Sequence, residues 1–440
     1  MPSTRPATVG LLTASAIAIA NMVGTGVFTS LGYQVLGIQS VFALLMLWVV
    51  GGLVALCGAL SYGELGTALP RSGGEYHLLA TIYHPSVGFL SGWVSATAGF
   101  VAPTAIAAIA LGKYTAVVFP GVPVNHLAAA VVVGFAAIHC VSIRWGSLFH
   151  NFFTFVKLGV ILLFIGAGLF TPTPQNITVW PAAAEWGVLA SAPFAVSLVY
   201  VSYAYTGWNA SIYIVGELRD PQRNLPRALL LSTWLVLALY AGLNYVFLYT
   251  VPIPELAGKV EIGFLAGSKL FGPAAAGALS LLIAGLMLST ISAMIFVGAR
   301  ITQVMGEDYP VLAALSRRSR VHTPVNAILF QAVITLLFIY TSTFEQVIVY
   351  ASFTLMLLTT LTVAGVYVLR WRRPDLPRPY RTWGYPVTPA VFLLANTWIM
   401  GYVLLERPLE SAIGLGIIAS GGAVYFLNAR LTGKGRKVKG

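Results

Sequence analysis

Long apolar stretches separated by short polar segments follow one another along almost the whole chain. A helix needs about 20 consecutive apolar residues to span a bilayer, and about twelve stretches approach or exceed that length. The pattern therefore predicts an all-α integral membrane protein of about twelve transmembrane helices. The predicted spans cover residues 9–35, 39–68, 86–118, 125–143, 149–170, 190–217, 226–251, 273–303, 324–341, 346–370, 386–405 and 409–428.

Two of these stretches are interrupted by residues that continue a helix poorly. The first contains Gly24-Thr25-Gly26, and the sixth contains Ala204-Tyr205-Thr206-Gly207-Trp208-Asn209. Glycine weakens a helix because it loses much backbone entropy on folding. Unpaired backbone at membrane depth is tolerated only where it lines a cavity or is buried in protein. Matching breaks in two halves of a chain point to the substrate site of a transporter.

Composition and charge are consistent with a membrane protein and fix its expected orientation. Of 440 residues, 58% are hydrophobic and 9% are charged, and the mean hydropathy is +0.84, whereas soluble domains carry about 25% charged residues. If both termini are cytoplasmic, 20 of the 25 Lys and Arg lie inside and Lys259, Lys269 and Arg407 lie outside. This bias, with contact to anionic lipid, accounts for the net charge of +12 without nucleic acid. The residues expected inside are Arg5, Arg71, Arg144, Arg219, Arg223, Arg227, Arg300, Arg317, Arg318, Arg320, Arg370, Arg372, Arg373, Arg378, Arg381, Arg430, Lys434, Arg436, Lys437 and Lys439.

The rest of the composition predicts one transmembrane domain over residues 1–440. The longest connections, 252–272, 304–323 and 371–385, are too short for a separate domain. Cys57 and Cys140 both fall inside predicted spans, so we expect no disulfide-linked partner subunit. The first apolar stretch is of full span length and holds the first break, so it is not expected to be a cleaved signal.

Several motifs, in their order along the chain, resemble one transporter family. They are Val23-Gly24-Thr25-Gly26-Val27-Phe28, Tyr62-Gly63-Glu64-Leu65-Gly66, Pro70-Arg71-Ser72-Gly73-Gly74-Glu75-Tyr76, the sixth-span break, and Arg378-Pro379-Tyr380-Arg381. The chain resembles the amino acid–polyamine–organocation (APC) superfamily and, within it, the L-type amino acid transporters. The resemblance implies an inverted-repeat (LeuT-like) fold with discontinuous first and sixth helices. The repeats would cover about 9–170 and 190–370, with two additional helices at 386–428.

The resemblance also implies how an amino acid would bind. Backbone amides around Gly24, Thr25 and Gly26 would take the carboxylate at the start of a half-helix, whose dipole favours an anion. Backbone carbonyls would accept hydrogen bonds from the ammonium group. No metal or cofactor is expected in this site. The matching carbonyls belong to Met22, Tyr203, Ala204 and Thr206.

Side chains of the sixth span suggest a gate and a size limit. Tyr203 matches an aromatic lid in the family, although an amphipathic packing role fits it too. Thr206 matches a position that is glycine in relatives taking large aromatic substrates, so we expect small or medium neutral L-amino acids. Trp208 and Asn209 are expected to support the unwound segment, with Asn209 bonding freed backbone.

Lys157 is a charge mid-way through the fifth predicted span, which marks a functional position by default. By resemblance it stands where sodium-coupled relatives hold an ion, which predicts sodium independence. Carrying a coupling proton and acting as a structural strut are open alternatives. Its expected partners are carbonyls near Gly24 and the hydroxyls of Ser289, Thr290 and Ser292. Tyr240 and Asn244 are expected nearby, either in function or in ordinary packing.

These observations favour a sodium-independent amino acid transporter that works by exchange or proton coupling with alternating access. It would lie in a plasma membrane (bacterial inner membrane) with both termini cytoplasmic, and a monomer would suffice. A cationic amino acid or polyamine carrier of the same fold is disfavoured, because no acid is expected at the midplane. Glu64, Glu75 and Glu217 are expected at the cytoplasmic side. Neither channel filter repeats nor catalytic motifs are visible, and a solute sensor remains an alternative.

Overall fold

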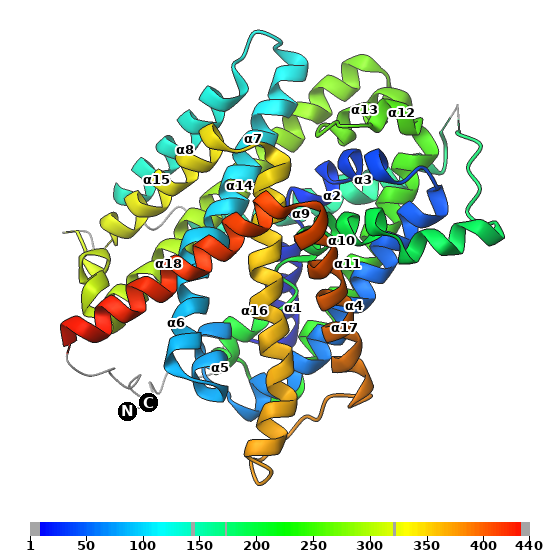
Figure 1. The fold of residues 1–440 in the computed structure, drawn as a ribbon. Helices are drawn as coiled ribbons and strands as arrows, with labels where there is room; N and C mark the ends of the chain where they lie inside the picture. Colours follow the sequence, from blue (N-terminus) through cyan, green and yellow to red (C-terminus); the bar gives the residue numbers. More distant parts are fainter. Residues whose placement is uncertain (1–8, 142–145, 172–173, 320–322, 433–440) are drawn as a thin grey trace.

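The computed structural model describes residues 9–141, 146–171, 174–319 and 323–432, and within them the fold is almost entirely helical (Figure 1). One isolated bridge pairs Val9 with Leu218. The α-helices are α1 Leu11–Met22, α2 Gly26–Thr29, α3 Leu31–Gly37, α4 Val41–Ala68, α5 Gly74–Ile82, α6 Pro85–Val94, α7 Val101–Val118, α8 Val124–Val141, α9 Gly146–Gly168, α10 Ala192–Tyr205, α11 Pro221–Thr250, α12 Ile253–Leu256, α13 Ile262–Phe271, α14 Pro273–Asp308, α15 Val325–Thr341, α16 Phe344–Arg372, α17 Val387–Glu406 and α18 Pro408–Thr432. A π-helical turn, η1 Ser95–Gly99, joins α6 to α7, and the 3-10 helices are η2 Ala183–Ala190, η3 Ala210–Glu217 and η4 Pro310–Ser316.

Helices occupy every one of the predicted spans. Within the described ranges, 9 helical segments are long and apolar enough to cross a membrane. The other three spans correspond to the described apolar part of α9, Phe152–Gly168, to α15, and to α10, which has 14 residues before its break. The protein is therefore a multi-span membrane protein. Of the basic residues used for orientation, Arg5, Arg144, Arg320, Lys434, Arg436, Lys437 and Lys439 lie outside the described residues.

The outward faces of the helices carry large apolar side chains. Leu337 of α15, Leu394 and Leu405 of α17 and Phe426 of α18 are all exposed. A soluble monomer rarely exposes contiguous apolar patches of more than a few hundred Å². These faces are instead suited to lipid tails, which is the environment that the composition predicts.

Local signals in the sequence set several helix ends. Ser40, Ser191 and Thr343 precede α4, α10 and α16, and each side-chain oxygen accepts a hydrogen bond from a backbone amide of the first turn. This satisfies amides that have no partner within the helix. Proline begins α6, α11 and α14, where its missing N–H costs no helical hydrogen bond.

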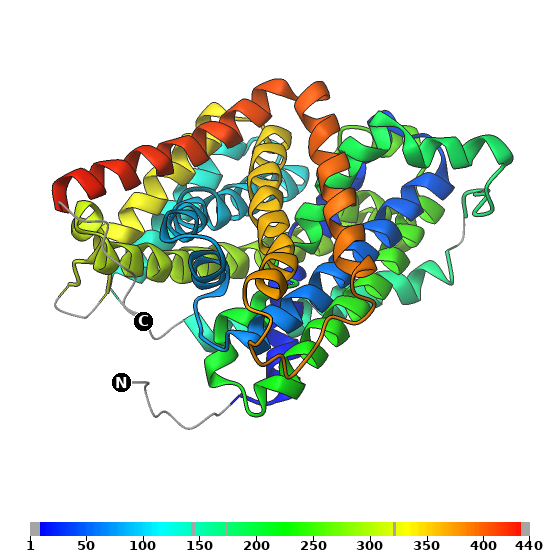
Figure 2. The same cartoon turned by 60° about the horizontal axis from the view of Figure 1, so that its bottom comes forward.

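The helices pack in two groups. The first group contains α1, α4, α10 and α11, and α17 packs against it; the second contains α7, α8, α14 and α15. In Figure 1 the first group lies toward the right and the second toward the left, and Figure 2 shows the same separation from another side. Helix α9 contacts both α11 and α14, and α16 contacts helices of both groups. These two helices therefore bridge the groups.

Both predicted helix breaks are present. Helix α1 ends at Met22, the chain bends through residues 23–25, and helical backbone continues from Gly26 because Ser30, between α2 and α3, keeps helical dihedral angles. Helix α10 ends at Tyr205, Thr206 has a ψ of 132°, and Gly207 has a φ of +104°. That φ is strained for any other residue type, and a Cβ on Gly207 would also lie 2.8 Å from Cβ of Asn21.

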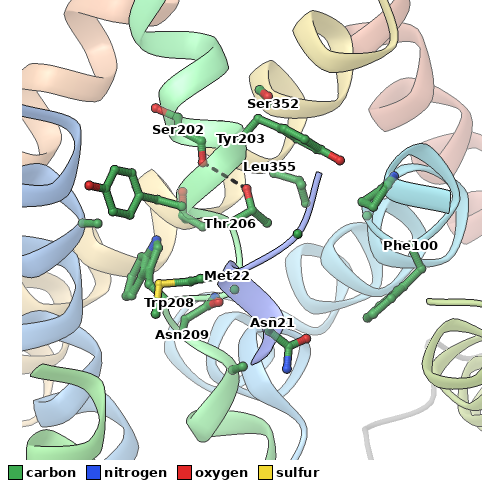
Figure 3. Close-up of a pocket in the computed structure, with 18 of the residues that line it drawn as sticks. Asn21, Met22, Phe100, Ser202, Tyr203, Thr206, Trp208, Asn209, Ser352 and Leu355 are labelled. Atoms are coloured by element: carbon green, nitrogen blue, oxygen red, sulfur yellow. Dashed lines mark hydrogen bonds between the residues drawn. The ribbon is translucent and has the colours of Figure 1, made fainter. Parts of the chain in front are cut away.

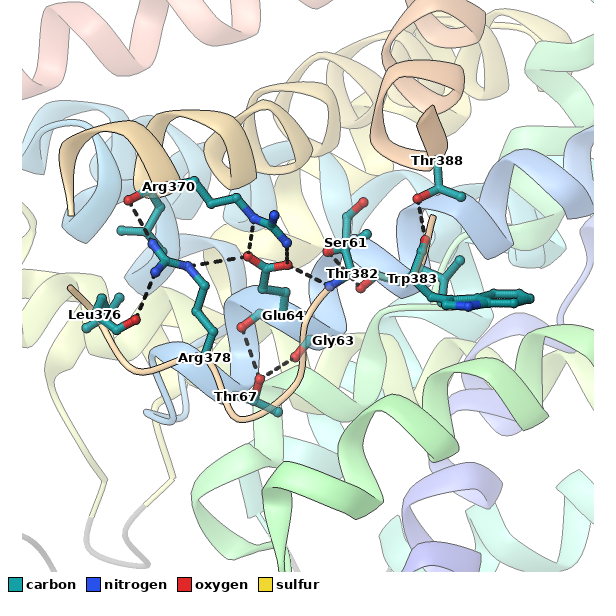
Figure 4. A network of polar contacts seen from close by, with 12 residues as sticks. Ser61, Gly63, Glu64, Thr67, Arg370, Leu376, Arg378, Thr382, Trp383 and Thr388 are labelled. Carbon is teal, nitrogen blue, oxygen red and sulfur yellow. Dashed lines mark hydrogen bonds and ion pairs between the residues drawn. The ribbon is translucent and has the colours of Figure 1, made fainter. Parts of the chain in front are cut away.

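An ion-pair network lies at one end of the molecule (Figure 4). The carboxylate of Glu64, at the end of α4, is 1% exposed and accepts a bidentate pair of hydrogen bonds from Arg370 of α16, at 2.8 and 2.6 Å. The amide of Thr382 donates to the same carboxylate at 2.6 Å, and Arg378 lies 3.5 Å away. Glu64 thus ties α4 to α16 and to the loop before α17. We call this end, with the loops at 69–73, 218–220 and 373–386, the arginine-rich side.

We predict that Glu64→Gln lowers the apparent melting temperature of the detergent-solubilised protein by several degrees. Removing one partner from a buried ion pair costs about 3–5 kcal/mol, since the other charge stays uncompensated. Glu307→Gln is the matched control, because Glu307 pairs with Arg318 at 3.0 Å on the surface, with both side chains about half exposed. Such pairs contribute about 0–1 kcal/mol. Equal melting temperatures for both variants would contradict this view of the network.

Candidate functional site

A cavity of about 490 Å³ lies between the two helix groups, at the level of both breaks. One wall consists of the broken segments, from Met22 to Gly26 and from Ser202 to Asn209. The opposite wall consists of η1, the start of α7 with Phe100, and part of α14 with Thr290. Figure 3 shows Met22, Thr206 and Trp208 on one side and Phe100 on the other. Space between two helix groups and bare backbone on its wall are what a carrier site requires.

The two breaks are joined by one side chain. The hydroxyl of Tyr240, in α11, lies 2.6 Å from the carbonyl oxygen of Met22 and 3.2 Å from that of Ala204, and donates its hydrogen bond to both. Tyr240 is fully buried, with aromatic contacts to Trp48 and Tyr205. Carbonyls that the breaks leave without helical partners thus share one donor. Each carbonyl oxygen keeps a second lone pair for a further donor.

Close approach of the two segments explains why glycine occupies position 26. A Cβ on Gly26 would lie 2.7 Å from both Cα and Cβ of Ala204. Because Gly26 begins a helical run, its amide and the amides beside it have no partner four residues earlier. The start of this run therefore offers N–H donors and the positive end of a helix dipole.

The cavity is closed on the side away from the arginine-rich side. The hydroxyls of Thr25 and Tyr203 lie 3.3 Å apart and bridge the two segments. One turn earlier on α10, the ring of Tyr200 stacks on Tyr33, which in turn stacks on Phe344. Toward the arginine-rich side, the cavity wall extends to the partly exposed Gly73 and the exposed Arg300. The structure thus has one closed end and one open end.

Lys157 lies beside the cavity wall and is buried. Its side chain, 2% exposed, donates a hydrogen bond of 2.8 Å to Thr290 of α14, whose residue lines the cavity. Of the three candidate hydroxyls, the structure thus brings Thr290 to Lys157. Ser289 donates to the carbonyl of Leu286, and Ser292 lies 3.0 Å from Nε2 of His139. Three-residue spacing puts Ser289 and Ser292 on one face, but the lysine meets the neighbouring face.

The other expected residues lie around the second break. Thr206 lines the cavity, and its hydroxyl donates to the carbonyl of Ser202 at 3.1 Å. The ring of Trp208 packs edge-on against Tyr62 and Phe392. Asn244, one turn from Tyr240 on α11, donates to the Tyr240 carbonyl at 2.9 Å.

The expectation that Asn209 bonds freed backbone with its side chain is wrong. Its Nδ2 donates instead to Oε1 of Glu75, at 2.8 Å, and Tyr62 donates to the same oxygen at 2.5 Å. Glu75 is 4% exposed and lines the cavity. Glu75 was expected at the cytoplasmic side, and its contact with Asn209 was not predicted, because loop 69–73 folds back against η3. Burial raises the pKa of the Glu75 carboxyl, and the hydrogen bonds from Tyr62 and Asn209 act in the opposite direction.

The chain is similar in sequence to known amino acid permeases and transporters. A sequence model of the family described as "Amino acid permease" matches residues 9–407. The chain is 33% identical to human "Large neutral amino acids transporter small subunit 2", an alignment that covers 95% of this chain and 80% of that protein. It is 30% identical to human "b(0,+)-type amino acid transporter 1", covering 95% of this chain and 87% of that protein.

We predict that Gly26→Ala destabilises the folded protein, because its methyl group would overlap Ala204. Overpacking a tight contact costs about 1–3 kcal/mol. Gly24→Ala is the matched control, since a Cβ on Gly24 would meet only the Met22 carbonyl, at 3.8 Å. Thermal unfolding in detergent should show a lower melting temperature for Gly26→Ala alone. If Gly24→Ala lowers the melting temperature by the same amount, close packing is not the reason for glycine at position 26.

Proposed function

The chain belongs to the amino acid permease family of the APC superfamily, and on this premise we propose that it carries small or medium neutral L-amino acids across the membrane without sodium. Membership makes it a transporter of amino acids and not an enzyme. The observation that carries the proposal is the meeting of the two helix breaks at one cavity.

An amino acid is a zwitterion, and the breaks offer complementary groups for both of its charges. The amides at the start of the helical run from Gly26 suit a carboxylate, with Gly24 and the Thr25 hydroxyl beside them. The carbonyls of Met22 and Ala204 already share the Tyr240 hydroxyl and retain lone pairs for an ammonium group. The carbonyls of Tyr203 and Thr206 complete the proposed acceptor set. Backbone recognition of this kind leaves side-chain specificity to the cavity walls.

The size preference is proposed from Thr206. Its side chain occupies part of the cavity between the breaks and is fixed by the hydrogen bond to Ser202. The cavity volume of about 490 Å³ would admit larger substrates, so local crowding beside the breaks is the proposed restriction. The name of one relative, "Large neutral amino acids transporter small subunit 2", supports a neutral substrate, whereas the smaller size is proposed from Thr206 alone.

Sodium independence is proposed from Lys157. The Lys157 ammonium group of α9, bonded to Thr290 of α14 on the cavity wall, would supply a positive charge there without a metal ion. A lysine in this position also offers a proton-binding group, so exchange and proton coupling both fit. We propose Ser289 and Ser292 as further polar support on α14 and Tyr203 as the lid on the closed side.

The conformational cycle follows from the same arrangement. We propose alternating access by movement of the α1, α4, α10 and α11 group against the second group, with inverted repeats of about 9–170 and 190–370 and added helices at 386–428. By the positive-inside rule the arginine-rich side would be cytoplasmic, so the cavity would face inward here. A single copy, in a plasma membrane and without a disulfide-linked subunit, is sufficient for this cycle.

A second candidate substrate class is favoured by one observation. Cationic amino acids or polyamines would benefit from an acid at the cavity, and Glu75 lines it. However, its described contacts are to neutral donors from Tyr62, Asn209 and Tyr213, which already use the carboxylate. Neutral substrates therefore remain the preferred class.

Uptake of labelled L-alanine into proteoliposomes tests the proposal. Vesicles should be empty or preloaded with unlabelled alanine, in sodium-free buffer, with and without an inward pH gradient. Uptake that requires internal alanine indicates exchange, and uptake into empty vesicles driven by the gradient indicates proton symport. Inhibition by lysine but not by serine would support the cationic class. Folded protein that transports neither class in any condition would refute the proposal.

We predict that Lys157→Ala reduces alanine exchange strongly, because the buried charge beside the cavity wall and its bond to Thr290 are both lost. Lys113→Ala is the matched control, since Lys113 also lies within a span, on α7, but is exposed. Initial rates and substrate half-saturation should be measured on both sides of the membrane. Unchanged rates and affinities for Lys157→Ala would leave the lysine as a structural strut.

We predict that Thr206→Gly widens substrate acceptance toward larger side chains. The change removes a hydroxyl and a methyl group from the cavity wall and leaves the break in place. Competition of leucine and phenylalanine against labelled alanine measures the effect, and both should compete more strongly than in the wild type. An unaltered competition profile would remove Thr206 from the specificity-determining wall.

A further inference from the structure

Glu75 is a buried acid. Among the described residues, those that form hydrogen bonds with its carboxyl carry no positive charge. It sits in the first turn of α5, and its carboxyl is held by three neutral side chains, Tyr62 of α4, Asn209 and Tyr213. Tyr62 and Asn209 both donate to Oε1, at 2.5 and 2.8 Å. Buried acids usually neutralise themselves or find a cation. A carboxyl that keeps only neutral donors therefore merits a functional explanation.

The segment that carries Glu75 is fastened to the chain beyond the second break. The amide of Gly216, in η3, donates to the hydroxyl of Ser72 at 3.1 Å. Gly74 has a φ of +56°, and a Cβ there would lie 2.2 Å from the ring of Tyr213. Residues 72–75 therefore lie directly against η3, and Asn209 at its start is one residue from Trp208 of the break.

The contacts of Glu75 join the two helix groups at the open end of the cavity. Its helix α5 packs mainly on α6, which continues through η1 into α7 of the second group. Its donors come from α4 and from the segment after α10, which belong to the first group. Movement of one group against the other must stretch or break these hydrogen bonds.

We propose that Glu75 is a proton-operated latch: the ionised carboxyl holds residues 72–75 on the broken sixth span, and protonation on the arginine-rich side releases them. An ionised carboxylate accepts short, strong hydrogen bonds, whereas a protonated one accepts weaker bonds. Because Glu75 lines a cavity that extends to the exposed Arg300, water can bring the proton to it. The latch rests on the proposed function, since it regulates the same group movement.

The sign of the pH effect follows from burial. Burial raises the pKa of Glu75 above its usual value, so protonation begins at a higher pH than for an exposed glutamate. As the pH on the arginine-rich side falls through that pKa, the latch weakens and exchange becomes faster. The titratable or charged groups around Glu75 are Tyr62, Tyr213, His77 and Tyr76 of α5, Arg71 of the preceding loop, which acts on His77, and Arg300 on the cavity wall. Of these, His77 also titrates in the range of the assay.

Alanine counterflow in oriented proteoliposomes tests the latch. The pH on the arginine-rich side is varied between about 5 and 8, a range in which the pKa of a buried glutamate can lie. The wild-type rate should rise severalfold as this pH falls. Glu75→Gln should run at the wild-type acidic rate at every pH. Tyr213→Phe removes a donor to the charged form and should move the midpoint upward by about one pH unit. His77→Gln is the control and should leave the midpoint in place.

Each outcome decides the proposal. A wild-type rate that does not change with pH, or a Glu75→Gln profile like the wild type, overturns the latch. If Glu75→Gln does not fold, an unmoved midpoint in Tyr213→Phe overturns it as well. Counterflow that is present but independent of pH refutes the latch alone. Absence of counterflow at every pH, from folded wild-type protein, refutes the proposed function instead.

Discussion

Backbone groups that leave a helix at membrane depth must find hydrogen-bond partners. Here the hydroxyl of Tyr240 is a donor shared by one carbonyl at each of the two breaks. Its bonds to Met22 and Ala204 fix the ends of α1 and α10 against one another. Close contact between Gly26 and Ala204 then brings the following amides to the same place. The cavity, the proposed donors for a carboxylate and the proposed acceptors for an ammonium group all depend on this junction.

Networks farther from the junction organise the two ends of the molecule differently. On the closed side, the hydroxyls of Thr25 and Tyr203 bridge the breaks, and an aromatic stack lies beyond them. On the arginine-rich side, Glu64 forms charged bonds to Arg370, while Glu75 forms bonds to neutral donors. A charged network suits a permanent fastening, and a carboxyl held by neutral groups can be released by a proton.

The sequence was sufficient for the helices and the breaks, because both follow from local composition. Apolar length marks the spans, and Gly-Thr-Gly and Thr-Gly-Trp-Asn interrupt them where the structure does. Side-chain partners were harder to predict. Of the three hydroxyls expected near Lys157, that of Thr290 accepts its hydrogen bond and those of the two serines do not, and Asn209 bonds Glu75 and not freed backbone. These contacts depend on helix rotation and on how loop 69–73 folds back, which a single sequence does not encode locally.

The most direct test of the account is a crystal structure with the best counterflow substrate bound. We expect the substrate to lie between the two breaks. Its carboxylate should lie within hydrogen-bond distance of the amides at Thr25 and Gly26, and its ammonium should face the carbonyls of Met22 and Ala204. A substrate bound beside Arg300 or elsewhere, with the breaks unoccupied, would contradict the central claim.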